Sequence, residues 1–197
     1  MTDDKTLAVY DEKAGDYARL IEKDEAPTGS LRTFLARLPA GGRVLDLGCG
    51  PGTWARHMLQ AGFEVDAIDG SQGMVDEASR IPGLNVRRAM FDDIEAASLY
   101  DGIWANFSLL HIPRAELPGV LDRLTRALRP GGILHIGLKE GQGEARDSLD
   151  RFYTYYTVEE ITALLASRGF SVSDLRTGAD KGLDGAVAAW FTLTAHG

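Results

Sequence analysis

The sequence feature that most constrains the fold is an apolar run that leads directly into a glycine-dense turn. Residues 43–47 predict a short buried strand, residues 48–52 (Gly-Cys-Gly-Pro-Gly) a tight turn, and the pattern from Thr53 onward a helix. Glycines let the backbone of such a turn adopt positive φ angles and approach a ligand closely. A strand, a glycine turn and a helix in this order indicate an α/β fold with a ligand at the carboxyl end of the strand.

The rest of the chain alternates short apolar runs with amphipathic stretches, which predicts βαβ units and a parallel sheet. Further strands are expected at residues 64–69, 84–89, 102–105, 133–138, 171–177 and 186–194. Helices are expected at residues 53–61, 73–80, 114–128 and 158–168, and Pro130-Gly131-Gly132 marks a stop after the third of these. The last two strands follow each other across a Gly- and Asp-rich turn, so we expect them to pair as an antiparallel hairpin at the sheet edge.

Residues 1–197 are expected to form a single domain, in which residues 41–197 are an α/β core and residues 1–40 an N-terminal helical cap. Residues 10–38 predict one or two helices, broken at Pro27-Thr28-Gly29. Residues 139–157 are long, charged and then aromatic, which is typical of a lid or a binding loop.

Composition limits the classes of partner. The net charge is -8, from 29 acidic and 21 basic side chains that are interleaved along the chain, so nucleic acid is not expected as a partner and a small-molecule acceptor fits better. The lone Cys49 excludes an internal disulfide, and the four histidines lack metal-ligand spacing, so no metal is expected. The chain starts without a basic and apolar leader and has no long apolar run, so we expect no membrane contact and a cytoplasmic location. Nothing in the sequence indicates an oligomeric state.

The residues around the glycine turn limit which classes of ligand it can bind. The dinucleotide fingerprint needs a third glycine where Thr53 stands, and a nucleotide phosphate loop needs a Gly-Lys-Ser/Thr that is absent. Asp46, two residues before the turn, would repel a pyrophosphate and attract a cationic ligand. Asp69 ends the next strand and could accept both hydroxyls of a ribose, or could serve only as a turn or cap residue. Met74 could lie on a purine ring, or could be ordinary core packing.

Together these segments resemble class I S-adenosylmethionine-dependent methyltransferases. The resemblance rests on residues 44–52, on Asp69, on residues 127–132 before the fifth strand and on residues 101–111. It implies S-adenosylmethionine as the cofactor and a Rossmann-like three-layer sandwich, with a seven-stranded sheet in the order 3-2-1-4-5-7-6 and the last strand antiparallel.

The resemblance also implies roles for individual residues, and a cofactor-binding set follows from it. Asp46 and the backbone of Gly48, Cys49 and Gly50 would hold the methionine part. Asp69, with Gly70 beside it, would hold the ribose, and Asn106 and Phe107 would line the side of the sulfonium. Tyr10 and Tyr17 share a stripe of the N-terminal helix with Ala14 and Ile21, and this stripe either faces the cofactor or simply docks the helix. Phe91 could flank the adenine, and Asp92 or Asp93 could accept its amino group, or the segment could be only a solvated acidic loop. Many relatives carry Gly-Asp where this chain has Ala89-Met90.

Methyl transfer is an in-line displacement that depends mainly on alignment of the reactants. His111 is the candidate catalytic base, although a histidine before Ile112-Pro113 could also serve only to orient its loop. The candidate substrate-binding residues come from the lid: Lys139, Arg151, Tyr153 and Tyr155, each of which could equally belong to a solvated loop with an aromatic anchor. Two alternative functions stay open at this point, a non-catalytic module that binds S-adenosylmethionine and an NAD-dependent oxidoreductase.

Overall fold

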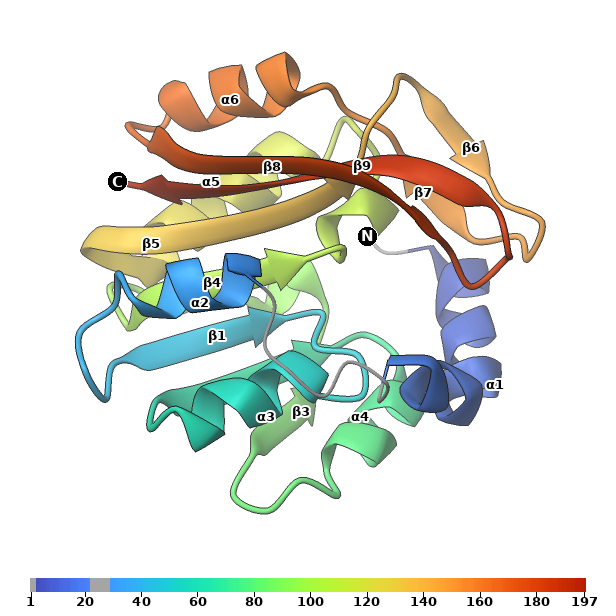
Figure 1. Ribbon diagram of the computed structural model, residues 1–197, viewed down its shortest axis with the longest axis horizontal. Helices are drawn as coiled ribbons and strands as arrows, with labels where there is room; N and C mark the ends of the chain where they lie inside the picture. The colour runs from blue at the N-terminus through green and yellow to red at the C-terminus, as the bar shows by residue number, and fades with distance from the viewer. Residues whose placement is uncertain (1–2, 22–28) are drawn as a thin grey trace.

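The computed structural model describes residues 3–21 and 29–197. A seven-stranded sheet with the order β3-β2-β1-β4-β5-β9-β8 forms the centre (Figure 1). Strands β1 to β5 are mutually parallel, whereas β9 runs antiparallel to both β5 and β8. The strands are β1 (Arg43–Leu47), β2 (Glu64–Asp69), β3 (Asn85–Arg88), β4 (Tyr100–Asn106), β5 (Leu128–Lys139), β8 (Ser171–Lys181) and β9 (Val187–His196). Because β8 and β9 are the sixth and seventh strands of this sheet, the predicted strand order and the antiparallel last strand are confirmed.

Helices cover both faces of the sheet and make it the middle of three layers (Figure 1). The helices are α1 (Asp4–Ile21), α2 (Gly29–Leu35), α3 (Thr53–Gln60), α4 (Gln72–Ala78), α5 (Leu117–Ala127) and α6 (Val158–Ala166), with single 3-10 turns η1 (Phe91–Asp93) and η2 (Leu109–His111). Successive residues of a strand face opposite sides. Val44 therefore packs with the core formed by α2, α3 and α4, while Leu45 and Leu47 pack with the core under α5 and α6.

The N-terminal helix lies at the end of the sheet toward which β1 and β4 point (Figure 1). It begins at Asp4, earlier than the expected residue 10, because Asp3 caps it: Asp3 Oδ2 accepts the backbone N–H of Thr6 at 2.9 Å. Asp11 on α1 accepts hydrogen bonds from Ser71 Oγ (2.6 Å) and from the backbone N–H of Gly73 (3.0 Å) at the start of α4. Of the expected helix break, Pro27 and Thr28 lie outside the described residues, and α2 begins at Gly29.

Residues 139–157 contain a two-stranded antiparallel hairpin, β6 (Glu144–Arg146) and β7 (Phe152–Thr154), which the sequence pattern did not predict. The strands are three residues long, and β6 is exposed throughout, so neither shows an apolar alternation. Asp147 stabilises the turn between them, since its Oδ1 accepts the backbone N–H of Leu149 and of Arg151, both at 3.0 Å.

The fifth strand is longer than expected. The preceding helix does end before Pro130-Gly131-Gly132, at Ala127, but β5 begins at Leu128 and includes these three residues. Leu128 pairs with Tyr100, and a register shift in β4 accommodates the irregular backbone, in which Gly131 has a φ of 75°. A Pro-Gly-Gly sequence stops a helix without excluding an extended strand.

Candidate active site

The glycine turn after β1 can be built only from glycine at its first position. Gly48 has a φ of 70°, and a Cβ there would lie 2.3 Å from the Cβ of Ser108, in the loop that follows β4. The backbone N–H groups of Gly48 and Cys49 both donate to the carbonyl of Ile68, at 2.8 and 3.0 Å. The turn is therefore pressed between the ends of β2 and β4, at the carboxyl edge of the sheet.

Asp69 lies at the end of β2 and joins two neighbouring turns. Its Oδ2 accepts the backbone N–H of Gly50 at 2.8 Å, and its Oδ1 accepts that of Ser71 at 2.9 Å. Burial raises the pKa of Asp69, against the effect of these N–H donors. A carboxylate has about four lone-pair sites, so each oxygen can still accept one hydroxyl of a diol.

A cavity of about 840 Å³, its open mouth included, lies above this turn. Its wall includes almost all of the predicted cofactor-binding residues, namely Gly48, Cys49, Gly50, Asp69, Gly70, Met74, Phe91, Asn106, Phe107, Tyr10 and Tyr17. His111 also lines it. Residues from α1, from the glycine turn and from the loops after β2, β3 and β4 therefore meet at one place although they are distant in the sequence.

Asp46 does not line this cavity, in contrast to its expected contact with the methionine part. It shares a face of β1 with Val44 and is 1% exposed near Ala55 at the start of α3, and its buried Oδ2 has no hydrogen-bond partner among the described residues. Burial and the nearby charge of Asp69 raise the pKa of Asp46 to about 8. The alternation of β1 thus directs this carboxyl into the helix layer, away from the cavity.

Asp92 also lies outside the cavity wall. Its side chain is 52% exposed in η1, with one carboxylate oxygen 3.9 Å from Arg123 Nε on α5. Asp93 is used locally, since its Oδ2 accepts the backbone N–H of Met90 at 2.8 Å. The wall at this point consists of Ala89, Met90 and Phe91, so apolar side chains and backbone stand where an acid was expected.

Several lining residues were missed from the sequence, chiefly Thr6, Leu7, Trp54 and Ser108. Thr6 and Leu7 precede the expected start of the first helix. The sequence does carry a signal for them, because an Asp three residues before Thr6 is a typical N-cap spacing. Trp54 and Ser108 reach the wall only through the packing of the two turns, for which no local pattern exists.

A second cavity adjoins the first one. The two share a wall formed by Tyr10, Tyr17, Ile21, Trp54, Asn106, Phe107 and His111. Of the predicted substrate-binding residues, Lys139, Arg151 and Tyr153 line the second cavity, whereas Tyr155 does not. The ring of Tyr155 lies 6.3 Å from that of Tyr153, further along the lid, and its carbonyl accepts a hydrogen bond from Arg114.

His111 lies at the junction of the two cavities with both ring nitrogens engaged. Nδ1 is 2.6 Å from the carbonyl oxygen of Phe152, and Nε2 is 2.9 Å from the hydroxyl of Tyr10. Because a carbonyl only accepts, Nδ1 carries the proton, and Nε2 accepts the Tyr10 O–H. Burial lowers the pKa of His111 to about 4, so the ring is neutral at pH 7. The Tyr10 oxygen in turn accepts a hydrogen bond from Arg151 Nη1 at 3.1 Å.

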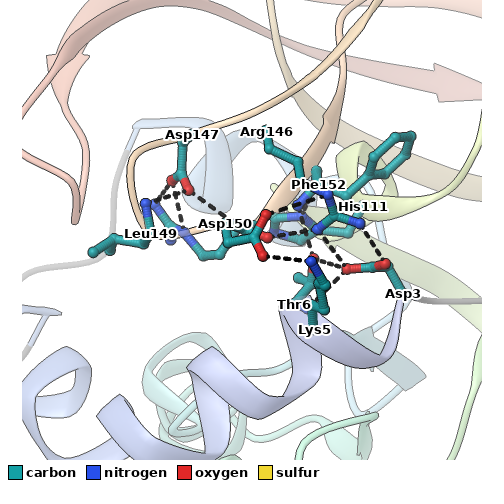
Figure 2. A network of polar contacts seen from close by, with 10 residues as sticks. Asp3, Lys5, Thr6, His111, Arg146, Asp147, Leu149, Asp150 and Phe152 are labelled. Carbon is teal, nitrogen blue, oxygen red and sulfur yellow. Dashed lines mark hydrogen bonds and ion pairs between the residues drawn. The ribbon is translucent and has the colours of Figure 1, made fainter.

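The lid and the N-terminal helix are joined by a polar seam (Figure 2). Arg146 Nη2 lies 2.7 Å from Asp3 Oδ1, Lys5 Nζ lies 2.9 Å from Asp150 Oδ2, and the backbone N–H of Phe152 donates to Thr6 Oγ1 at 2.8 Å. Of the seam residues, Thr6 also lines the first cavity.

Within residues 3–21 and 29–197, no group of His, Cys, Asp and Glu side chains has the arrangement of a metal site. Over the same residues, none of the helices combines the length and the apolar character required to cross a bilayer.

Comparison with known proteins decides the family. Residues 20–175 match a family model described as a methyltransferase domain. The chain belongs to this methyltransferase family. The membership confirms the resemblance to a methyltransferase family that the sequence motifs indicated.

Three similar proteins illustrate the relationship. A trans-aconitate 2-methyltransferase from Delftia acidovorans is 32% identical over 91% of this chain and 72% of its own length. A malonyl-[acyl-carrier protein] O-methyltransferase from Enterobacter lignolyticus is 37% identical over 57% of this chain and 46% of its own length. The crystal structure of Burkholderia thailandensis 1,6-didemethyltoxoflavin-N1-methyltransferase, with bound 1,6-didemethyltoxoflavin and S-adenosylhomocysteine, has the same fold, with a TM-score of 0.77 and 23% identity over 98% of this chain and 87% of that one. The matches to the first curated relatives span about half of their length or less.

Proposed function

We propose that this methyltransferase transfers a methyl group from S-adenosylmethionine to a small-molecule acceptor by in-line displacement. The observation that carries the proposal is the junction of the two cavities at Asn106, Phe107 and His111. A cofactor in the first cavity and an acceptor in the second would meet there. The proposal treats residues 1–197 as one domain, with residues 1–40 as a cap and residues 139–157 as a lid.

The first cavity suits the proposed cofactor on two observations. A Cβ at Gly48 would push into Ser108, so this turn keeps its backbone bare at the cavity wall. Asp69 keeps lone pairs for a ribose diol beyond its two backbone hydrogen bonds. When bound, S-adenosylmethionine supplies an electrophilic methyl group on a sulfonium whose leaving group is a neutral thioether.

The chain's own contribution is alignment. Tyr10 and Tyr17 pack edge to face, with ring centroids 5.8 Å apart, and cover the junction from α1. Asn106 and Phe107 bound it from the end of β4. Holding the reactants in line and excluding water can lower a barrier by about 7–11 kcal/mol. We assign His111 a positioning role, because its Nε2 already accepts the Tyr10 proton and its Nδ1 bonds to the lid.

Ligand binding and turnover test the proposal separately. S-adenosylhomocysteine at about 100 times its dissociation constant should stabilise the fold by about 2.7 kcal/mol, a rise in melting temperature of about 5–10 °C, and NADH should give none. Transfer of a radioactive methyl group from S-adenosylmethionine to a panel of small acids, amines and phenols then identifies the acceptor. Binding of S-adenosylhomocysteine without transfer to any acceptor would favour a non-catalytic module, and a shift with NADH alone would favour an oxidoreductase.

A further inference from the structure

The second cavity concentrates positive charge in an acidic protein. Four cationic side chains line it, Lys139, Arg151, Arg176 and Lys181. Among the described lining residues the only carboxylate is Asp180, whose Oδ2 accepts the indole N–H of Trp190 at 2.7 Å. The whole chain carries a net charge of -8, so this cavity differs in sign from the molecule around it. A local field of this sign attracts an anion.

Not all of these cations are available to a ligand. Arg151 forms a buried ion pair with Asp147 at 2.6 Å, and Arg176 pairs with Asp174 at 3.1 Å. Lys139, the last residue of β5, forms no ion pair with a carboxylate in the described part of the chain, and the charges of Asp184 and Asp147 act on it only from a longer distance. Its ammonium instead lies 3.8 Å from the centre of the Tyr153 ring.

Lys139 is partly shielded from water, so the lack of an ion-pair partner has an energetic cost. The residue is half-buried, and burial lowers the pKa of its ammonium. A partly desolvated charge without an ion-pair partner is costly, and an aromatic face compensates for only part of that cost. An anionic group of the acceptor would supply the missing partner.

The junction of the two cavities restricts which chemical group of the acceptor can react. His111 Nε2 accepts the Tyr10 O–H, and His111 Nδ1 donates to the Phe152 carbonyl, so neither nitrogen is free to take a proton. Asp180 is exposed on β8 and does not line the cofactor cavity. A nucleophile that already lacks a proton at neutral pH suits such a junction, and a carboxylate is one.

We propose that the acceptor is a small molecule with at least two carboxylates, of which one accepts the methyl group and Lys139 binds another. The inference rests on the proposed methyl transfer and names its substrate class. A carboxylate oxygen forms the new bond to the methyl carbon, and the bond from this carbon to sulfur breaks with its electron pair going to sulfur. The negative carboxylate and the positive sulfonium become a neutral ester and a neutral thioether, and no proton is released.

The test is calorimetric titration of the protein, saturated with S-adenosylhomocysteine, with trans-aconitate, citrate and malonate. The trimethyl ester of trans-aconitate is the uncharged control. We expect at least one of the three acids to bind the wild type, and to bind at least about tenfold more tightly than the ester. Lys139→Met should weaken that binding by at least about tenfold, and Lys139→Arg should restore most of it.

The matched control is Lys13→Met, which removes the same charge from α1 at a residue that lines neither cavity. It should leave affinity for the acid within about twofold of wild type. Affinity for S-adenosylhomocysteine, measured first, should be the same in all variants, because Lys139 does not line the cofactor cavity.

The outcomes separate this inference from the proposed function. Failure of the wild type to bind S-adenosylhomocysteine would refute the proposed function itself. If S-adenosylhomocysteine binds but none of the acids does, or if Lys139→Met and Lys13→Met bind the acid equally, the assignment of Lys139 and the polycarboxylate class are overturned. Equal binding of the ester and the acid would overturn them as well.

Discussion

Replacement of Arg151 by methionine should destabilise the fold strongly, because it leaves a buried carboxylate without its cation. The side chains of Arg151 and Asp147 are only 3% and 4% exposed. Nη2 and Nε of Arg151 both donate to Asp147 Oδ2, at 2.6 and 2.9 Å, and Nη1 donates to the Tyr10 hydroxyl. The pair therefore links the lid to the N-terminal helix at the edge of the second cavity.

The magnitude follows from what remains around Asp147. Removal of one partner from a buried ion pair costs about 3–5 kcal/mol. Two backbone N–H groups still donate to Oδ1 of Asp147, so the lower end, about 3 kcal/mol, is expected. For a chain of this length that corresponds to a fall in melting temperature of about 6–12 °C, measured by calorimetry or by urea unfolding. The matched control is Arg19→Met, which breaks an exposed pair with Asp16 and should cost less than about 1 kcal/mol.

The pH dependence gives the prediction a second readout. Arg151 holds the pKa of Asp147 below its usual value, against the effect of burial. The pair therefore stabilises the fold fully above the unfolded pKa of about 3.9, and this stabilisation is lost as the pH falls through the lower folded pKa. The difference in stability between wild type and Arg151→Met should shrink in acid. Equal costs for Arg151→Met and Arg19→Met at pH 7 would refute the assignment of a buried, stabilising pair.

Three further predictions concern the cofactor cavity and its surroundings. Asp69→Asn should weaken binding of S-adenosylhomocysteine by about 10–100-fold in calorimetry, because a charged acceptor for the ribose diol is lost; unchanged affinity would exclude the ribose contact. Gly48→Ala should lower the free energy of unfolding by about 2–4 kcal/mol, since it combines a positive φ with a collision at 2.3 Å, whereas Gly62→Ala, with a φ of 88° and open space around it, should cost about 1 kcal/mol. His111, whose pKa falls from 6.5 to about 4 on folding, should make stability decrease by about 3 kcal/mol as the pH falls between these values, because the unfolded state then binds the proton that the folded state excludes. His111→Gln should flatten that part of the pH profile, and an unchanged slope would contradict a neutral, buried His111.

The strand order and the place of the cofactor cavity could be predicted from the sequence because both depend on local signals. The turn at Gly48 requires a positive φ and a bare backbone, and both requirements are visible as glycine. Short apolar runs separated by helical patterns predict a parallel sheet, and the carboxyl ends of its strands meet at one edge. Asp69, Asn106 and Phe107 could be assigned to the cavity for this reason alone.

Other parts of the site depend on how side chains pack across elements. Asp46 precedes the glycine turn by two residues, yet the alternation of β1 directs it beneath α3. Asp92 and Asp93 look equivalent in the sequence, but one is exposed near Arg123 and the other caps η1. No local pattern distinguishes these environments, because a carboxylate has the same sequence signature on either side of a strand or turn.

The sequence by itself determined the family, the sheet order and the edge at which ligands bind, since periodicity and glycine conformation act between near neighbours in the chain. Only the tertiary structure decided the state of His111, which depends on Tyr10 from α1 and on Phe152 from the lid, 101 and 41 residues away. It likewise decided that Arg151 forms a buried ion pair and that the Lys139 ammonium lies against the Tyr153 ring. Hydrogen bonding and desolvation of a side chain are set by whatever the fold brings within about 3–4 Å, and sequence separation carries no information about that.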